Sequence, residues 1–301
     1  MILAQISDLH VRPKGMLCND RVDSNAMLAA QVAALSGLNV RPDCVLATGD
    51  LTDRGLVEEY EHLRDMLEPL DMPVFLVPGN HDRRENMLKV FGGTRRLPVT
   101  GGFLQYAVED FPVRLVGLDT IEPGRSDGLF CAERESWLRA RLDEGDDRPT
   151  LLFMHHPPFR TGLVPMDMIM CRGAERMAGV VRDYPRVKRV VCGHHHRPIQ
   201  AMWAGILASC SPASAHQVCL EMEEKDCMLV MEPPAYQLHT WEREMGFVSH
   251  MAYVERYPGP YPFILGDDYP GGEACPPPLR PSPHGPGTVW NPDRRSGCRT
   301  V

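Results

Sequence analysis

Short apolar runs alternate with longer amphipathic segments along the first two thirds of the chain. The apolar runs have the length of buried strands and cover 2–6, 44–47, 74–77, 150–154 and 189–192. The amphipathic segments carry apolar residues at helical spacing and cover 24–38, 58–70, 83–91, 132–142 and 171–184. Strands that alternate with crossover helices predict an α/β fold with parallel strands.

Four further segments predict antiparallel pairs. Residues 103–108 and 113–118 flank a short turn, and 199–203 and 206–209 flank Ala204-Gly205. These pairs extend the predicted parallel core.

The pattern changes after about residue 210. Segments 227–231, 236–243 and 247–255 predict strands that carry aromatic residues, and Pro and Gly dominate from 257 onward. Such a Pro-rich segment cannot form a helix or a central strand. The sequence therefore predicts three parts, which are a catalytic domain at 1–210, a β cap that serves oligomerisation at 211–256, and a C-terminal arm or tail at 257–301.

Composition narrows the class of protein. The chain has 301 residues, of which 43% are apolar and 24% charged, as in soluble globular proteins. No apolar run approaches the ~18 residues of a membrane span, and the N-terminus predicts a first strand instead of a signal peptide. The ten cysteines lack Cys-x-x-Cys spacing, which favours buried thiols. We therefore expect a cytoplasmic protein without membrane contact.

The charge of the chain bears on its substrate. A formal net charge of -8 leaves no basic stripe for long nucleic acids. A polymer nuclease is therefore disfavoured. A small anionic substrate held by metal ions remains compatible with this charge.

Polar residues follow the predicted strands at their carboxyl ends. Asp8 and His10 follow the first strand, Asp50 follows the second, and Asn80 and His81 follow the third. Each of these groups alone could be an ordinary polar turn. Three strand ends in succession are hard to explain by turn chemistry, and open α/β sheets place their ligands at this edge.

Histidines follow the two later strands of the core. Adjacent side chains of an extended chain point to opposite sides, so only one of His155 and His156 is expected to be a ligand, and we predict His156. In the later triplet, His194 and His196 share a side while His195 faces away.

The collected residues predict a binuclear metal centre. They are two carboxylates, one amide and four imidazoles, namely Asp8, His10, Asp50, Asn80, His156, His194 and His196. Nitrogen and oxygen ligands without thiolate suit Mn, Fe, Co or Zn in the divalent or trivalent state, and seven ligands exceed one tetrahedral site. Asp50 would be a ligand of both metals. Asp8, His10 and His196 would complete one site, and Asn80, His156 and His194 would complete the other.

Two such metals predict phosphoester chemistry. They can hold a bridging hydroxide that attacks phosphorus in line. Next to the ligand Asn80, His81 would bind the phosphate and either stabilise the transition state or protonate the leaving alkoxide. A purely structural hydrogen bond is the alternative for His81. The polar loop around Ser126 could border the pocket, although an ordinary surface loop has the same composition.

The five strand-end motifs resemble those of calcineurin-like metallophosphoesterases. They are Asp8-x-His10, Gly49-Asp50, Gly79-Asn80-His81-Asp82, His155-His156 and Gly193-His194-x-His196. The resemblance covers about residues 1–210 and fills every ligand position. It implies a four-layer α/β/β/α fold, a binuclear centre and hydrolysis of phosphoesters.

Further residues resemble the bacterial cyclic-nucleotide and glycerophosphodiester phosphodiesterases of that family. These are His155-His156-Pro157-Pro158, the stretch from Met166 to Cys171, and Ser214 to Val218 before the small C-terminal β cap. The resemblance implies a metal-dependent phosphodiesterase for small diesters, with His216 near the substrate and with homodimers or larger assemblies formed through the cap. A phosphomonoesterase or a non-catalytic scaffold of the same fold is the alternative. The natural substrate and the metal pair stay open.

Overall fold

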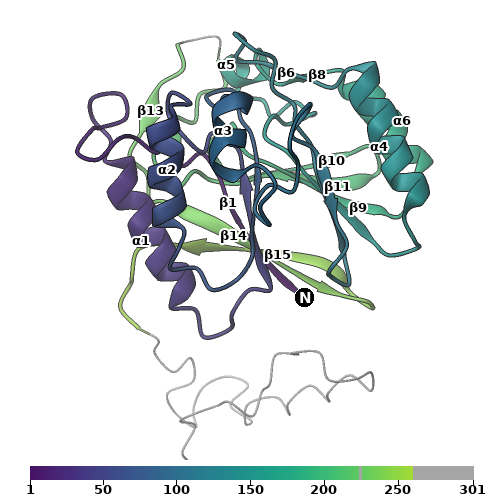
Figure 1. The fold of residues 1–301 in the computed structure, drawn as a ribbon, viewed down its shortest axis with the longest axis horizontal. Coiled ribbons are helices and arrows are strands. Elements are labelled where there is room, and N and C mark those ends of the chain that lie inside the picture. Colours follow the sequence, from purple (N-terminus) through teal and green to yellow (C-terminus); the bar gives the residue numbers. More distant parts are fainter. Residues whose placement is uncertain (224–225, 260–301) are drawn as a thin grey trace, which may run out of the picture. The chain divides into compact units, whose positions relative to one another are not determined.

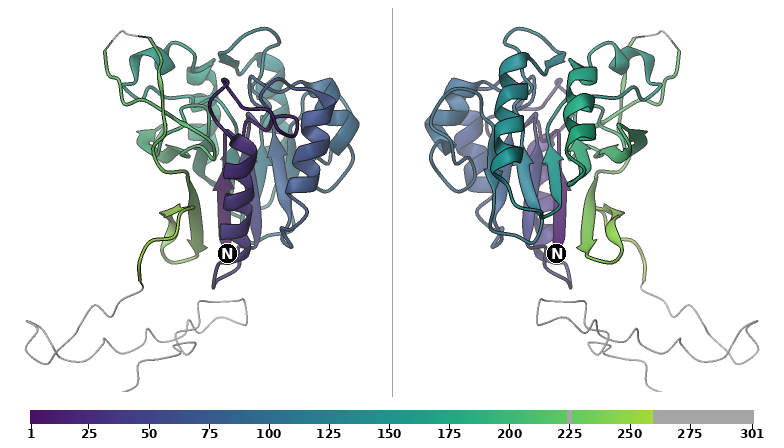
Figure 2. Two further views of the ribbon diagram at one scale, coloured as in Figure 1. Left: turned by 90° about the vertical axis from the view of Figure 1, so that its left-hand side faces the viewer. Right: turned by 90° about the vertical axis from the view of Figure 1, so that its right-hand side faces the viewer.

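Two β-sheets lie between two layers of helices in the computed structural model, which describes residues 1–223 and 226–259 (Figures 1 and 2). The first sheet has the strand order β15-β14-β1-β2-β3. Its members are β1 (Ile2–Ile6), β2 (Cys44–Thr48), β3 (Val74–Val77), β14 (Ala235–Glu242) and β15 (Gly246–Tyr253). Residues Met1–Glu255 form one compact unit that contains both sheets.

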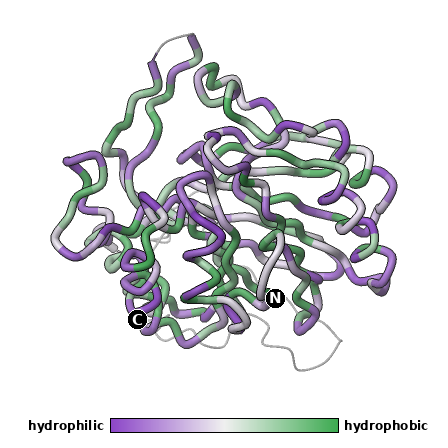
Figure 3. The backbone as a smooth tube through the Cα atoms, turned by 45° about the horizontal axis from the view of Figure 1, so that its top comes forward, coloured by the Kyte–Doolittle hydropathy of each residue, from purple (hydrophilic) through white to green (hydrophobic). Residues whose placement is uncertain are grey.

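The second sheet has the order β10-β11-β9-β7-β5-β4. Its members are β4 (Tyr106–Val108), β5 (Arg114–Gly117), β7 (Thr150–Phe153), β9 (Val187–Cys192), β10 (Ile199–Trp203) and β11 (Ile206–Cys210). Side chains from both sheets, such as Leu3 and Val45 from one and Leu115 and Phe153 from the other, share one buried cluster. Figure 3 shows hydrophobic stretches through the middle of the fold and hydrophilic stretches at many outer turns.

Helices cover the outer faces of the two sheets and complete the four-layer α/β/β/α arrangement (Figure 1). On one side lie α1 (Ser24–Ser36), α2 (Val57–Met66) and α3 (Arg84–Phe91), and on the other lie α4 (Ala132–Glu144) and α6 (Ala174–Asp183). Asp23 caps the first of these helices through its carboxylate, which accepts from Ala26 N at 3.0 Å. The predicted α/β sandwich is thereby confirmed.

Parallel pairing brings several strand ends to one edge. Strand β1 pairs parallel with β2, and β2 with β3. In the second sheet, β5, β7 and β9 also run parallel. Because the carboxyl ends of parallel strands lie at the same edge of a sheet, the loops after these strands meet there.

The predicted helix at 171–184 starts at a later residue in the structure than the sequence indicated. Cys171–Arg172 is the short strand β8, which pairs with β6 (Gly128–Leu129), and the helix starts at Ala174. Gly173 between them has φ +82°, a left-handed conformation that ends the strand before the helix. The predicted start was wrong because apolar spacing does not register this turn.

The segment expected as a cap is divided between two places. β14 pairs antiparallel with β1 and β15 follows β14, so both extend the first sheet. Only β12 (Gln217–Val218) and β13 (Leu229–Val230) form a separate two-stranded ribbon. Residues 260–301 of the predicted arm lie outside the described residues. Within the described part, no helix is both long and apolar enough to cross a membrane.

A polar network is buried where the first and second sheets face each other. Arg189 of β9 is 1% exposed, and its Nη2 donates to Ser209 Oγ at 3.1 Å and Ser249 Oγ at 3.0 Å. His239 of β14 lies 2.7 Å from Ser249 Oγ through Nδ1 and 3.0 Å from Gln5 Oε1 through Nε2. Burial, with the nearby Arg189 charge, lowers the pKa of His239 to about 3.

This network predicts a loss of stability in acid. In the unfolded chain, His239 becomes protonated below its ordinary pKa of 6.5. In the folded protein it stays neutral until about pH 3. The free energy of unfolding therefore falls as pH drops through this window, by about 1.4 kcal/mol per pH unit from this one group. Denaturant titrations at several pH values give the free energy of unfolding at each pH. Its slope against pH should be smaller for His239→Gln than for wild type. The exposed His250→Gln is the matched control, and equal slopes for all three proteins would contradict this prediction.

Candidate metal centre

The predicted ligand residues lie on five loops that directly follow parallel strands. Asp8 and His10 follow β1, Asp50 follows β2, Asn80 follows β3, and the two histidine motifs follow β7 and β9. Backbone bonds join the first two loops, because Asp8 N donates to Gly49 O and His10 N to Asp50 O, both at 3.0 Å. The topology of the sheets therefore gathers residues that are far apart in sequence.

The backbone is strained where these side chains converge. Among the described residues, few non-glycine residues have positive φ, and five of those are predicted ligands: Asp8 (54°), His10 (45°), Asp50 (46°), His194 (69°) and His196 (50°). This region is unfavourable for residues with a Cβ, and such strain concentrates at functional sites.

The first donor group consists of Asp8, His10, Asp50 and His196. Their ligand atoms all lie within 4.8 Å of one another, and all four residues are buried. His196 Nε2 is 3.2 Å from Asp8 Oδ1 and 3.3 Å from His10 Nε2. His10 Nε2 lies 3.9 Å from Asp50 Oδ2, which brings the shared carboxylate to this group.

The second donor group begins on the same carboxylate oxygen. Asp50 Oδ2 is 3.3 Å from His155 Nε2. That nitrogen also lies 3.1 Å from Asn80 Oδ1 and 3.2 Å from His194 Nδ1. Asp50 therefore stands between two sets of donors.

The contacts favour His155 over the predicted His156 in the second group. His156 Nδ1 lies 2.8 Å from Thr120 Oγ1, and its Nε2 lies 3.2 Å from the carbonyl of Ser126. His156 still belongs to a cluster with His155 and His194 whose ring nitrogens lie within 4.8 Å. Strand alternation could not decide between neighbours in a loop. The difference is visible only in the structure, where Gly49 makes room for His155, because a Cβ at Gly49 would come within 2.4 Å of His155 Nδ1.

The protonation states of Asp50 and His194 suit metal binding, whereas burial lowers the pKa of His155 but the charge and hydrogen bond of Asp50 raise it to about 9, so this ring must lose a proton when it binds a metal. Burial raises the pKa of Asp50, but the charges of His155 and His81 outweigh it and hold the pKa well below its ordinary value. Burial, together with His156, lowers the pKa of His194 well below the usual range. An ionised carboxylate and a neutral imidazole are the ligand forms that bind metals. The donor set therefore fits two metal ions with nitrogen and oxygen ligands.

His81 lies at the open side of the donor groups and is 40% exposed. Its Nδ1 is 2.7 Å from the carbonyl of Asp53, and its Nε2 is 4.0 Å from Asp50 Oδ2. The Asp50 charge raises the pKa of His81 against the smaller effect of burial. The imidazole therefore holds a proton readily and directs Nε2 toward the site.

The sequence analysis did not single out Asp53. Besides holding His81 through its carbonyl, it places Oδ1 3.5 Å from His10 Nδ1. A carboxylate behind a ligand histidine fixes the orientation of the ring. Its place three residues after Asp50 was the available signal.

Asp82 joins the loops after β2 and β3. Its carboxylate accepts from Gly79 N at 2.8 Å, Leu51 N at 3.0 Å, Thr52 N at 3.2 Å and Tyr60 Oη at 2.9 Å. Burial, with the Asp50 charge, raises the pKa of Asp82 to about 6. Asp82 is thus a brace between the loops that carry Asp50 and Asn80.

The two weaker candidates for substrate contact each touch a histidine of the site. The carbonyl of His216 accepts from His196 Nδ1 at 2.8 Å, and its ring is centred 4.8 Å from that of His196. Burial lowers the pKa of His216 to about 3, so its ring is neutral. Ser126 is exposed and contacts His156 through its carbonyl. Both orient histidines in the structure.

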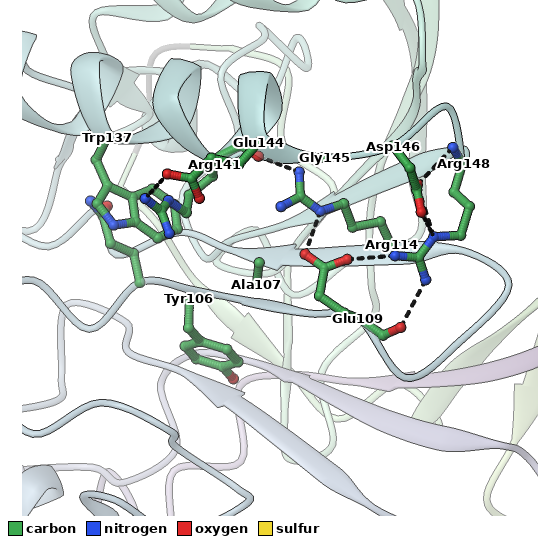
Figure 4. A pocket seen from close by; sticks show the side chains of 11 residues that line it. Tyr106, Ala107, Glu109, Arg114, Trp137, Arg141, Glu144, Gly145, Asp146 and Arg148 are labelled. Atoms are coloured by element: carbon green, nitrogen blue, oxygen red, sulfur yellow. Dashed lines mark hydrogen bonds and ion pairs between the residues drawn. The ribbon is translucent and has the colours of Figure 1, made fainter.

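A separate pocket of about 630 Å³ lies between β4, β5 and the end of α4, and none of the predicted site residues lines it (Figure 4). Its charges are largely paired. Arg114 donates to Glu109 at 2.6 Å, and Arg148 donates to Glu109 and Asp146 at 2.8 Å. It therefore carries none of the metal-binding chemistry.

Comparisons with known proteins agree with this geometry. The family profile described as calcineurin-like phosphoesterase matches residues 1–198. An Arcobacter nitrofigilis protein named "Probable glycerophosphodiester phosphodiesterase GpdQ" is 37% identical over 87% of this chain and 97% of its own. A Synechococcus protein named "Probable cyclic nucleotide phosphodiesterase" is 35% identical over 71% of this chain and 81% of its own. A crystal structure of a dimetal phosphatase from Danio rerio shares the fold, with 15% identity, TM-score 0.56, and coverage of 85% of this chain and 99% of that one.

Proposed function

Because the chain belongs to the calcineurin-like phosphoesterase family, we propose that it hydrolyses small phosphodiesters of the cyclic nucleotide or glycerophosphodiester type. The observation that carries this proposal is the Asp50 carboxylate, whose Oδ2 lies 3.3 Å from His155 Nε2 and 3.9 Å from His10 Nε2. A carboxylate shared in this way can hold two metal ions side by side. The names of the relatives favour diesters over monoesters.

The chain's own residues divide into two ligand sets. Asp8, His10, Asp50 and His196 would hold one ion, and Asp50, Asn80, His155 and His194 the other. When bound, two metal ions neutralise phosphate oxygens and make water a stronger nucleophile at neutral pH. Nitrogen and oxygen donors of this kind accept Fe, Mn, Zn or Co.

His81 supplies proton chemistry beside these ligands. The Asp53 carbonyl holds its Nδ1 hydrogen, which leaves Nε2 to face the phosphate. As the ester P–O bond breaks, the Nε2 proton passes to the departing alkoxide and His81 becomes neutral. While protonated, the same ring stabilises negative charge on a phosphate oxygen. Next to His81 in the same loop, Asn80 places its own amide oxygen 3.1 Å from His155 Nε2.

A comparison of two aryl phosphates tests the proposal. Metal-reconstituted protein should cleave bis-p-nitrophenyl phosphate with a kcat/KM at least about tenfold above that for p-nitrophenyl phosphate. The reason is that a diester carries one negative charge fewer than a monoester. The buried carboxylates Asp8 and Asp50 therefore repel it less. Chelator-treated protein is the control. The reverse preference would replace this proposal with a phosphomonoesterase of the same fold, and no turnover of either ester would favour a scaffold.

Two finer points belong to the same proposal. We expect a homodimer or larger homo-oligomer through the edge strand β15, which pairs only with β14 among the described residues and exposes Val248 and Met251. We also expect the protein to act in the cytoplasm without membrane or long nucleic acid as partner. The free thiols of its described cysteines fit a reducing compartment.

A further inference from the structure

An apolar surface borders the metal centre, and we propose that it binds the apolar part of one alcohol of the diester. This inference rests on the proposed phosphodiesterase function and specifies the substrate class as diesters that carry an alkyl or aryl chain. The surface, called here the methionine rim, is formed by Met168, Leu220, Met222, Met228 and Met231. All five side chains are more than half exposed.

The first part of the rim follows α5 (Val164–Asp167). Ile169 in this segment accepts a hydrogen bond through its carbonyl from Nε2 of the ligand His194, at 3.0 Å. Met168 is the preceding residue and is 72% exposed. The exposed side chain is thus one residue away from a direct contact with the second donor group.

The second part of the rim is the β12–β13 ribbon. It begins at Gln217, directly after His216, whose carbonyl accepts from the ligand His196 at 2.8 Å. Arg197 Nη1 donates to the carbonyl of Val218 at 2.6 Å and so fixes the base of the ribbon. The ribbon continues beyond Val218 because Cys219 N donates to the carbonyl of Met228 at 2.7 Å. The ribbon that starts beside the first donor group therefore carries exposed apolar residues on both of its arms.

The two segments that carry the rim touch each other. Cys227 Sγ lies 3.5 Å from Met166 Sδ, which joins the ribbon to α5. Figure 1 shows β13 and α5 at the same end of the molecule, and Figure 3 shows hydrophobic residues on both arms of the ribbon. The two segments are therefore in contact with each other, and each is hydrogen-bonded to a ligand histidine.

Side-chain chemistry indicates an apolar occupant. Four of the five rim residues are methionines, whose flexible side chains adapt to apolar ligands of different shapes, and exposed apolar patches commonly mark binding sites. The ribbon also carries Glu221, Glu223 and Asp226, which disfavour a second anionic group on the substrate. The matching ligand is an uncharged hydrocarbon chain attached to a single phosphodiester.

A homologous series of substrates tests this inference. Methyl, butyl and octyl esters of p-nitrophenyl phosphate keep the same leaving group and vary only the chain that would contact the rim. Complete burial of a methylene contributes about fourfold in affinity, and burial against an open surface about twofold. We therefore expect kcat/KM of the metal-loaded wild type to rise roughly twofold per methylene.

Two substitutions remove the apolar surface without approaching the metals. Met168→Ser and Met228→Ser should each flatten the dependence of kcat/KM on chain length. Met202→Ser is the matched control, because Met202 is 74% exposed on β10 and lies outside the rim. A wild type that shows no chain-length dependence, or rim variants that keep it, would overturn the proposal.

A binding experiment separates this inference from the proposed function. Monoalkyl phosphates of the same chain lengths are titrated calorimetrically into manganese-loaded protein. An affinity that rises with chain length and loses this dependence in Met228→Ser supports the rim even when no diester is hydrolysed. Affinities that are independent of chain length overturn it. A dimer that dissociates in Met228→Ser during sedimentation, without any chain-length effect, would assign the surface to a second copy of the chain.

Discussion

Replacing Asp50 with asparagine is expected to lower kcat/KM for bis-p-nitrophenyl phosphate by about a thousandfold or more. Its Oδ2 contacts both donor groups, so the substitution weakens both metal sites together and removes the charge that raises the pKa of His81. The loss of one preorganised electrostatic group already costs about 10²–10³ in rate. Elemental analysis should show that metal content falls from about two ions per chain to one or fewer.

The control for this substitution is Asp147→Asn. Asp147 is an exposed acid on the loop between α4 and β7, so its replacement removes the same charge without touching a donor group. It should keep both metals and full turnover. If Asp50→Asn retained wild-type activity with two bound metals, the binuclear centre proposed around Asp50 would have to be abandoned.

The adjacent histidines His155 and His156 offer the second large effect. His155→Gln should lower kcat/KM by about a hundredfold or more and release one metal ion, because Nε2 of this residue faces Asp50, Asn80 and His194. His156→Gln should cost about tenfold and keep both ions, since its nitrogens contact Thr120 and Ser126. Each variant is measured for turnover and for bound metal.

The pair of variants is internally matched, because both replace a fully buried histidine of one loop with the same residue. Circular dichroism checks that both remain folded. A larger loss of metal from His156→Gln than from His155→Gln would restore His156 as the ligand. Equal losses would mean that both rings bind the second ion.

The convergence of the site was predictable because topology enforces it. Asp8, Asp50 and Asn80 each follow a parallel strand, and the carboxyl ends of parallel strands share one edge. Apolar runs are sufficient to locate such strands. The presence of two carboxylates and several imidazoles at that edge was therefore readable from the chain alone.

Other features depend on contacts that periodicity does not encode. The proposed choice of His155 over His156 rests on the contacts of His155 Nε2 with Asp50 and Asn80 and on the space that Gly49 leaves for the ring. The role of Asp53 requires knowledge that its carbonyl approaches His81. The pairing of β14 with β1 joins residues more than two hundred positions apart, and no local pattern announces that partner.

The left-handed backbone conformations of the ligand residues lower the stability of the fold, although the activity depends on these residues. A glycine at Asp8, His10 or Asp50 would relieve backbone strain while removing a ligand. Selection for hydrolysis is therefore what keeps these residues in place. The loops that carry the ligands are therefore the part of the fold where a gain in the free energy of unfolding would cost activity.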